Sequence, residues 1–284
     1  MGGADDNKPL VHIERSNGVA VITLSSPETG NALGVEMAEA LLAKVQLAAN
    51  DAAVRCVLLT AEGRFFCVGG DVKRIAASGD GVGALLDRIT TPLHAAVSIL
   101  LHMDKPLVTA VNGPVAGGGL GLAVVGDIVL ASDSAHFSMA YTGIGFSPDG
   151  GSSWLLPRLI GLRKTQELAY LNSRLASEEA VALGLITRAV PAENLARDAR
   201  DVADALAKGP VAAFAATRRL LLPSGGMNPE AQMDMEAASV RAQAIAAEGR
   251  EGVSAFLGKR QPNFAAMGGD HARVHSAQDS GEAV

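Results

Sequence analysis

Two glycine-rich turns each follow a short apolar run, and together they could present backbone N–H groups to a single oxygen atom. One turn, at residues 67–71, follows the run 54–60, and the other, at 117–119, follows 107–111 and leads directly into a helical pattern. N–H groups at a helix N-terminus have no intrahelical partner and lie at the positive end of the helix dipole. If the two turns converge, these groups would form an oxyanion hole. For either turn alone, glycines that only permit close packing are the better explanation.

Asp149 is a carboxylate that could move protons beside such a hole. It stands in the segment 147–154, whose sequence is Ser-Pro-Asp-Gly-Gly-Ser-Ser-Trp. A positioned carboxylate can remove a proton from one atom and deliver it to another. The same segment is also a good helix N-cap sequence, because an Asp before an apolar run can accept from the first helical N–H groups. Taken alone, an Asp in this setting is more often a cap than a base, so both roles of Asp149 stay open.

The elements that must position these residues follow from the apolar pattern along the chain. Asn17-Gly18 between two apolar or alternating runs predicts a β-hairpin. The pattern predicts buried strands at 54–60, 107–111 and 128–131, a last short strand at 186–190, and helices at 34–50, 82–103 with an interruption at Pro92, 120–125 and most of 157–256. Strand, turn, helix and strand at this spacing favour an α/β fold of repeated ββα units. We expect an α/β core at 8–205, a helical region at 206–264 and a disordered tail at 265–284.

Composition excludes several classes of function. The chain has 284 residues with a net charge of -6 and no basic run, which argues against nucleic-acid binding. The apolar stretch 115–125 is too short and too rich in glycine to span a membrane. Two cysteines fit a reducing compartment, and six scattered histidines form no metal-ligand pattern. We therefore expect a cytoplasmic protein that binds no metal, dinucleotide, nucleic acid or membrane.

Several ordered motifs resemble one known family over residues 11 to 264. They are Asn31-Ala32-Leu33, the stretch from Phe66 to Lys73, Lys105-Pro106, Val111-Asn112-Gly113, Ala116 to Gly119, Gly126-Asp127-Ile128 and the stretch from Phe256 to Phe264. At this spacing they resemble the crotonase (enoyl-CoA hydratase/isomerase) superfamily. The resemblance implies a spiral core of ββα units, and a helical C-terminal region that forms a homotrimer or a dimer of trimers. It also implies an acyl-CoA thioester as substrate, with no separate cofactor.

The resemblance assigns roles to individual residues of the two turns and their neighbours. The N–H groups of Val68 and Gly118 would bind the thioester oxygen. The substrate or its CoA moiety would be bound by Asn31, Leu33, Cys67, Gly70, Asp71, Val72, Lys73, His94, Val115, Gly117, Tyr141, Pro148 and Lys259. Lys259 and Arg260 are the candidates to meet CoA phosphates, and Lys73 is a weaker one. Surface cations without a ligand explain each of the three almost as well.

The chain departs from the two-glutamate pattern of the family's hydratases. Gly121 and Tyr141 stand where those enzymes have their glutamates. Paired carboxylates suit the addition of water, whereas a double-bond shift needs only one base. The segment around Asp149 resembles the isomerase branch, closest to the isomerases of phenylacetate breakdown. The sequence therefore predicts an enoyl-CoA isomerase in which Asp149 is the base.

Three alternatives remain beside this interpretation. The first is an enoyl-CoA hydratase. The second is an aryl-CoA dehalogenase-like enzyme, because such enzymes have a nucleophilic Asp at the position of Asp149, a His at that of His94 and a Trp at that of Tyr141. The Tyr and the Ser-Pro before Asp149 rank it well below the isomerase. The third is a relative that only binds acyl-CoA or RNA, against which the retained turns, Asp149 and the absence of a basic stripe argue.

Overall fold

A computed structural model describes residues 8–267, with two β-sheets at the centre of the molecule. The large sheet has the order β1-β2-β3-β4-β6-β9; β1 and β2 pair antiparallel, and the other neighbours pair parallel. Its strands are β1 Val11–Ser16, β2 Val19–Leu24, β3 Cys56–Ala61, β4 Leu107–Val111, β6 Ile128–Ser132 and β9 Arg188–Val190. All the strands expected from the sequence are therefore present, with small shifts of their ends.

The β1–β2 hairpin turns at the predicted pair. Asn17 has φ 53° and Gly18 has φ 77°, the left-handed conformations that a two-residue turn between twisted strands requires. Ser16 pairs with Val19 directly across this turn. The hairpin prediction is confirmed.

Helices cover both faces of the large sheet. Because side chains alternate along a strand, Val57 and Leu59 of β3 face one core, while Cys56 and Leu58 face the other. Helices α1 (Val35–Asn50) and α3 (Val82–His102) pack together and belong to the first core, and α7 (Leu195–Lys208) packs on the opposite face. Burial on both faces explains why these strands are continuous apolar runs rather than alternating ones.

A small second sheet positions the glycine turns. It contains β5 (Val115–Ala116), β7 (His136–Ser138) and β8 (Leu175–Ala176) in the order β5-β7-β8. The chain leaves β4 of the large sheet, enters β5 of the small one and then forms α4 (Gly118–Val124). This is the ββα unit predicted from the sequence, and the α/β spiral is confirmed.

Helix α3 differs from its prediction in one respect. It runs through Pro92 as a single helix, whereas the sequence predicts an interruption there. The buried side chains of Ile89 and Leu93 on either side of the proline keep this stretch on the core, and that packing outweighs the loss of one backbone hydrogen bond. By length and composition alone, Gly79–His102 could also cross a membrane. Its apolar face, however, packs against α1 within the same chain.

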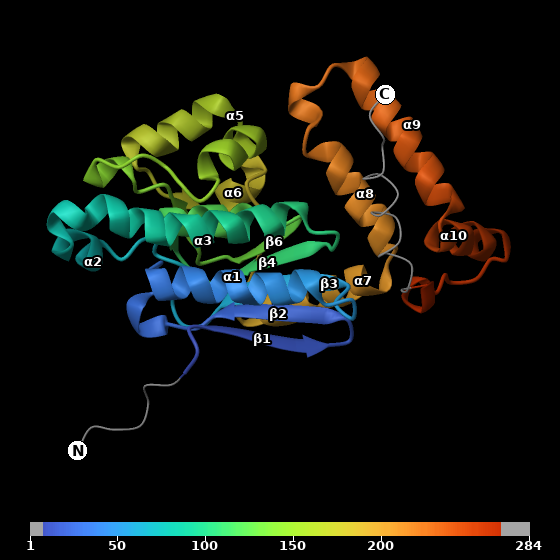
Figure 1. The fold of residues 1–284 in the computed structure, drawn as a ribbon, viewed down its shortest axis with the longest axis horizontal. Coiled ribbons are helices and arrows are strands. Elements are labelled where there is room, and N and C mark those ends of the chain that lie inside the picture. Colours follow the sequence, from blue (N-terminus) through green and yellow to red (C-terminus); the bar gives the residue numbers. More distant parts are fainter. Residues whose placement is uncertain (1–7, 268–284) are drawn as a thin grey trace, which may run out of the picture.

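Six further α-helices complete the described chain. They are α2 (Val72–Ala77), α5 (Ser152–Leu171), α6 (Ser177–Leu183), α8 (Val211–Leu221), α9 (Pro229–Ile245) and α10 (Ala247–Leu257). Figure 1 shows α8, α9 and α10 together at one end, with α2 at the other. The expected domain boundary at 205/206 lies inside α7, which packs on the sheet and ends at Lys208. Residues 268–284 lie outside the described part of the chain, and so does most of the predicted tail.

Candidate active site

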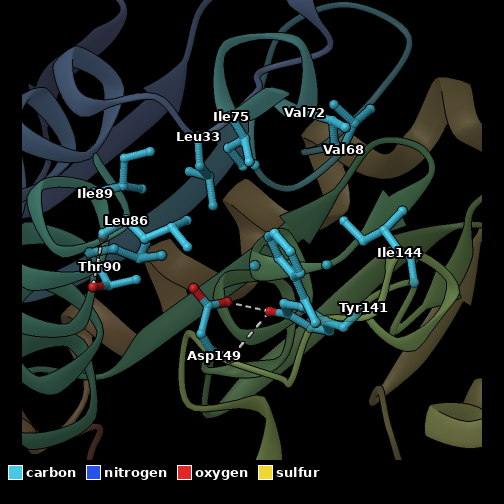
Figure 2. A pocket seen from close by; sticks show the side chains of 16 residues that line it. Leu33, Val68, Val72, Ile75, Leu86, Ile89, Thr90, Tyr141, Ile144 and Asp149 are labelled. Atoms are coloured by element: carbon cyan, nitrogen blue, oxygen red, sulfur yellow. Dashed lines mark hydrogen bonds between the residues drawn. The ribbon is translucent and has the colours of Figure 1, made fainter. Parts of the chain in front are cut away.

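A cavity of 110 Å³ lies between α2, α3 and the two glycine turns. Its lining is almost entirely apolar, with Tyr141, Asp149 and Thr90 as its polar side chains (Figure 2). The lining residues are Leu33, Val68, Gly70, Val72, Ile75, Leu86, Ile89, Thr90, Leu93, Gly117, Gly118, Ala140, Tyr141, Ile144, Phe146 and Asp149. Such an enclosed apolar pocket with a few convergent polar groups has the character of a small-molecule site.

One wall of the pocket comes from α3, whose individual lining residues were not predicted from the sequence. Leu86, Ile89, Thr90 and Leu93 line the cavity from one face of this helix. Their spacing of i, i+3, i+4 and i+7 is the signal that would have found them. The Thr90 hydroxyl donates to the Leu86 carbonyl oxygen at 2.9 Å, so its hydrogen is not directed to a ligand.

The two glycine turns converge, as predicted. The Ala116 N–H donates to the Cys67 carbonyl oxygen at 3.0 Å, and Cys67 forms a parallel bridge with Val115. Gly69 has φ +88°, and a Cβ atom on it would lie 2.9 Å from the Ala116 carbonyl oxygen. A side chain there would separate the turns, so glycine is required for their close approach.

The backbone donors at these turns differ from the predicted pair. The Val68 N–H donates to the Gly30 carbonyl oxygen at 3.1 Å and is not available to a ligand, which corrects the assignment of Val68 to the oxyanion hole. In the same turn, Gly70 forms a parallel bridge with Leu33: Leu33 N donates to Gly69 O at 2.7 Å and Asp71 N to Leu33 O at 3.4 Å. In this pattern the Gly70 N–H points away from Leu33.

Gly70 and Gly118 are donors of the two glycine turns whose N–H groups the described backbone leaves for a ligand. Gly118 is the first residue of α4, where an N–H group has no intrahelical partner. Within residues 8–267, neither the Gly70 nor the Gly118 N–H donates a backbone hydrogen bond, while the Gly117 N–H donates to Ser138 O at 3.2 Å. Both glycines line the cavity.

Asp149 lies beside Gly118 and is held by its neighbours. A Cβ atom on Gly118 would lie 3.3 Å from Asp149 Oδ1, so the carboxylate is adjacent to this donor. The Tyr141 hydroxyl donates to Asp149 Oδ1, and Figure 2 shows the two side chains pointing toward each other. The Ser152 hydroxyl donates to the Asp149 carbonyl oxygen at 2.7 Å. Asp149 is not a side-chain cap, because α5 begins after Gly151 without a side-chain cap hydrogen bond.

Tyr141 keeps its proton in this setting. Burial, followed by the negative charge of Asp149, raises the pKa of Tyr141 well above its usual range. A protonated phenol donates its hydrogen, whereas an ionised carboxylate can only accept one. The direction of the Tyr141–Asp149 hydrogen bond is therefore fixed.

The structure has no room for a second carboxylate at residue 121. A Cβ atom on Gly121 would lie 1.8 Å from the Gly150 carbonyl oxygen, so a glutamate there would displace the turn that holds Asp149. Within the described chain, Asp149 is the only Asp or Glu that lines the cavity. The position of the Gly150 carbonyl group therefore excludes the glutamate that the family's hydratases have at residue 121.

His94 supports the Asp149 turn rather than lining the cavity. Its Nε2 accepts from the Gly150 N–H at 3.1 Å, which requires an unprotonated Nε2. The residue is otherwise exposed and is not among those lining the pocket. Its predicted role in substrate binding becomes a role in fixing the turn.

Several other predicted binding residues have structural roles. Asn31 is fully buried, and its side chain bonds to the backbone of Ser26, Glu62 and Phe65. Asp71 caps α2 by accepting from Arg74 N at 3.1 Å. The residues Cys67, Val115 and Pro148 also do not line the cavity. Burial raises the pKa of the Cys67 thiol to about 12, so it stays protonated.

The predicted CoA-binding cations are not brought to the pocket. Lys73 is exposed on α2 and does not line the cavity. Lys259 follows α10, which lies at the opposite end of the molecule from α2 (Figure 1). Arg260 is paired with Glu251 at 2.6 Å. In contrast, the predicted residues Leu33, Gly70, Val72, Gly117, Gly118 and Tyr141 all meet at the cavity.

The described residues include no cluster of three or more His, Cys, Asp or Glu side chains that could hold a metal ion. The chemistry available at the cavity therefore rests on two backbone donors, one carboxylate and one tyrosine. Such a set can stabilise a negative oxygen and transfer a proton beside it.

Comparisons with known proteins show the family of the chain. Residues 14–267 match the family described as enoyl-CoA hydratase/isomerase. A Rhodobacter capsulatus protein named "Probable enoyl-CoA hydratase" is 40% identical over 255 residues, which cover 89% of this chain and 97% of that protein. The 1,2-epoxyphenylacetyl-CoA isomerase of Escherichia coli is 38% identical over 259 residues, covering 90% and 97%. The crystal structure of an enoyl-CoA hydratase from a Polaromonas species has a TM-score of 0.85 at 31% identity, covering 89% and 98%.

Proposed function

Since the chain belongs to the enoyl-CoA hydratase/isomerase family, we propose that it shifts a carbon–carbon double bond in an acyl-CoA thioester, with Asp149 as its base. The observation that carries this proposal is the single carboxylate of the cavity, placed beside the Gly118 N–H. CoA enters as part of the substrate, and we expect no further cofactor.

The proposed reaction uses the two backbone donors and the carboxylate in sequence. The thioester oxygen accepts from the Gly70 and Gly118 N–H groups, neither of which donates elsewhere in the described backbone. Asp149 takes a proton from the α carbon of a 3-enoyl thioester, and the C–H electrons delocalise into a dienolate. The proton then returns to the γ carbon, which leaves the conjugated 2-enoyl product. Each oxyanion donor contributes about 3 kcal/mol to such a step.

The crowding at Gly121 favours isomerisation over hydration. Hydration needs one group to activate water and another to deliver a proton to the α carbon. The Gly150 carbonyl oxygen, 1.8 Å from a Cβ at residue 121, excludes the first of the family's two glutamates, and Tyr141 replaces the second. Relatives carry both hydratase and isomerase names, so the name of a relative does not decide between the reactions.

The first test follows the conjugated-thioester absorbance with 3-enoyl-CoA and 2-enoyl-CoA as separate substrates. We expect a rise with the 3-enoyl compound and little loss with the 2-enoyl compound. Asp149→Asn should lower kcat by roughly 10²- to 10⁴-fold, because the base is lost. Binding of a saturated acyl-CoA should change little, since the oxyanion donors and the apolar walls remain.

Asp80→Asn serves as the matched control, because Asp80 is exposed and lies outside the cavity lining. Loss of absorbance with 2-enoyl-CoA would identify a hydratase instead. Halide release from a halogenated aroyl-CoA would favour the dehalogenase alternative, in which Asp149 attacks the ring. Full activity of Asp149→Asn would refute the role of Asp149 as base.

A further inference from the structure

The Tyr141 hydroxyl is held against the Asp149 carboxylate, although a double-bond shift by one base does not by itself require a tyrosine. The Tyr141 hydroxyl donates to Asp149 Oδ1 and lies 3.3 Å from the Asp149 carbonyl oxygen. Tyr141 is only 8% exposed, and its own carbonyl oxygen accepts from Ile144 N at 3.1 Å and Phe146 N at 3.0 Å. The phenol is therefore held in place by a compact turn.

The Asp149 end of the contact is equally constrained. Its carbonyl oxygen accepts from the Ser152 N–H at 3.1 Å and from the Ser152 hydroxyl at 2.7 Å. The next peptide is fixed by the hydrogen bond from Gly150 N to His94 Nε2. With both ends anchored, the carboxylate cannot turn about its own bond without losing the phenol.

The two oxygens of this carboxylate are consequently not equivalent. Oδ1 accepts the Tyr141 hydrogen, whereas Figure 2 shows the other oxygen turned away from Tyr141. A carboxylate that accepts a hydrogen bond is stabilised in its ionised form. The phenol, whose pKa is raised by burial and by the neighbouring charge, remains the donor.

We infer that Tyr141 is a positioning residue that holds Oδ1 of Asp149, so that Oδ2 alone both removes and returns the substrate proton. This inference rests on the proposed function, because it says which oxygen of the Asp149 carboxylate transfers the proton in the proposed double-bond shift. It makes the transfer occur on one face of the substrate, since the proton never leaves a single oxygen.

The proton that Asp149 removes from the substrate is the proton that it returns. The bond from the α carbon to hydrogen breaks, the proton joins Oδ2, and the carbon electrons enter the dienolate. The Oδ2–H bond then breaks as the bond from hydrogen to the γ carbon forms. Tyr141 keeps its own proton throughout, and its hydrogen bond favours the ionised carboxylate that reappears when the proton is returned.

The test is Tyr141→Phe, which removes only the hydroxyl. We expect kcat to fall by roughly 10- to 100-fold because the carboxylate loses its alignment, with KM nearly unchanged. In deuterium oxide, the variant should retain less of the substrate's own proton in the product than the wild type does.

Tyr170→Phe is the matched control, because the chain has two tyrosines and Tyr170 is 71% exposed. This variant should keep the wild-type kcat and proton retention. A Tyr141→Phe variant with wild-type values for both measurements would overturn the inference, even if Asp149→Asn is inactive. In that case the proposed function would stand without it.

A titration of tyrosinate absorbance tests the contact independently of activity. In the wild type, Tyr141 should ionise only at a pH clearly above the usual range of a tyrosine, because burial and the charge of Asp149 raise its pKa. Tyr141→Phe should remove the late step, and Asp149→Asn should move it to lower pH. A wild-type titration with no late step that Tyr141→Phe removes would refute the contact. If the wild type shifts no double bond, the proposed function fails and the positioning role of Tyr141 in that reaction fails with it.

Discussion

Gly121 and the turn at 149–151 occupy adjoining space, and this proximity sets which side chains the site can contain. A Cβ atom on Gly121 would lie 1.8 Å from the Gly150 carbonyl oxygen and 2.8 Å from its carbonyl carbon. These are backbone atoms, so relief requires movement of the turn rather than of a flexible side chain. The carboxylate of Asp149 would move with it.

Gly121→Ala should therefore impair both stability and activity. We expect the free energy of unfolding to fall by roughly 1–3 kcal/mol through overpacking, and kcat to fall because Asp149 is displaced. Urea unfolding and the 3-enoyl-CoA assay measure the two effects. Gly83→Ala is the control, since Gly83 is exposed on α3 with open space around it. A Gly121→Ala protein as stable and active as the control would contradict this account.

Helix α2 forms the outer wall of the cavity and has a side-chain cap at its N-terminus. Val72 and Ile75 of this six-residue helix line the pocket, and no residue of α2 is fully buried. The Asp71 side chain accepts from Arg74 N at 3.1 Å. Arg74 also pairs with Glu36 on α1, but both side chains are largely exposed and such pairs contribute little. At the other end of the helix, the Ser78 hydroxyl donates to the Ile75 carbonyl oxygen at 2.6 Å, so the Asp71 cap fixes the N-terminal end that carries Val72.

Replacing Asp71 separates its structural role from substrate binding. Asp71→Ala should destabilise α2 by about 1 kcal/mol and raise KM, because the wall that carries Val72 loosens. Asp71→Asn retains a capping oxygen, so its KM and thermal stability should stay close to the wild type. A similar rise of KM in both variants would instead show that the carboxylate itself serves the substrate.

At the scale of the whole molecule, helix α9 presents exposed apolar side chains. Helix α9 has no buried residue, and its Met233 and Val240 are 56% and 65% exposed. These two residues lie seven apart, on one face of the helix. The exposed surface supports the prediction of a homotrimer or a dimer of trimers, in which these helices would contact neighbouring subunits.

Val240→Glu should weaken such an assembly by placing a charge in an apolar contact. Light scattering coupled to size-exclusion chromatography should then show a smaller particle than the wild type at micromolar concentration. Leu47→Glu is the matched control, because Leu47 is an exposed apolar residue of α1, 49% exposed. The predicted interface would be wrong if both variants had the wild-type mass.

Much of the fold could be predicted because its signals are local. The Asn17-Gly18 turn requires left-handed residues, and the buried strands appear as apolar runs because helices cover both sheet faces. The glycine turns and Asp149 were visible for the same reason: each is a distinctive short segment beside a predictable element. The α3 wall was also visible in principle, from the spacing of its apolar residues.

The amino-acid sequence by itself determined the α/β spiral, the convergence of the two turns and the presence of one candidate base. Only the tertiary structure decided which backbone N–H groups remain free: Val68 is bonded to Gly30, while Gly70 is turned away from Leu33. It likewise decided that Asn31 serves the backbone and that Tyr141 holds Asp149. A hydrogen bond or a close contact between distant segments depends on how the chain packs. The spacing of residues within one segment therefore cannot predict which groups of another segment it will contact.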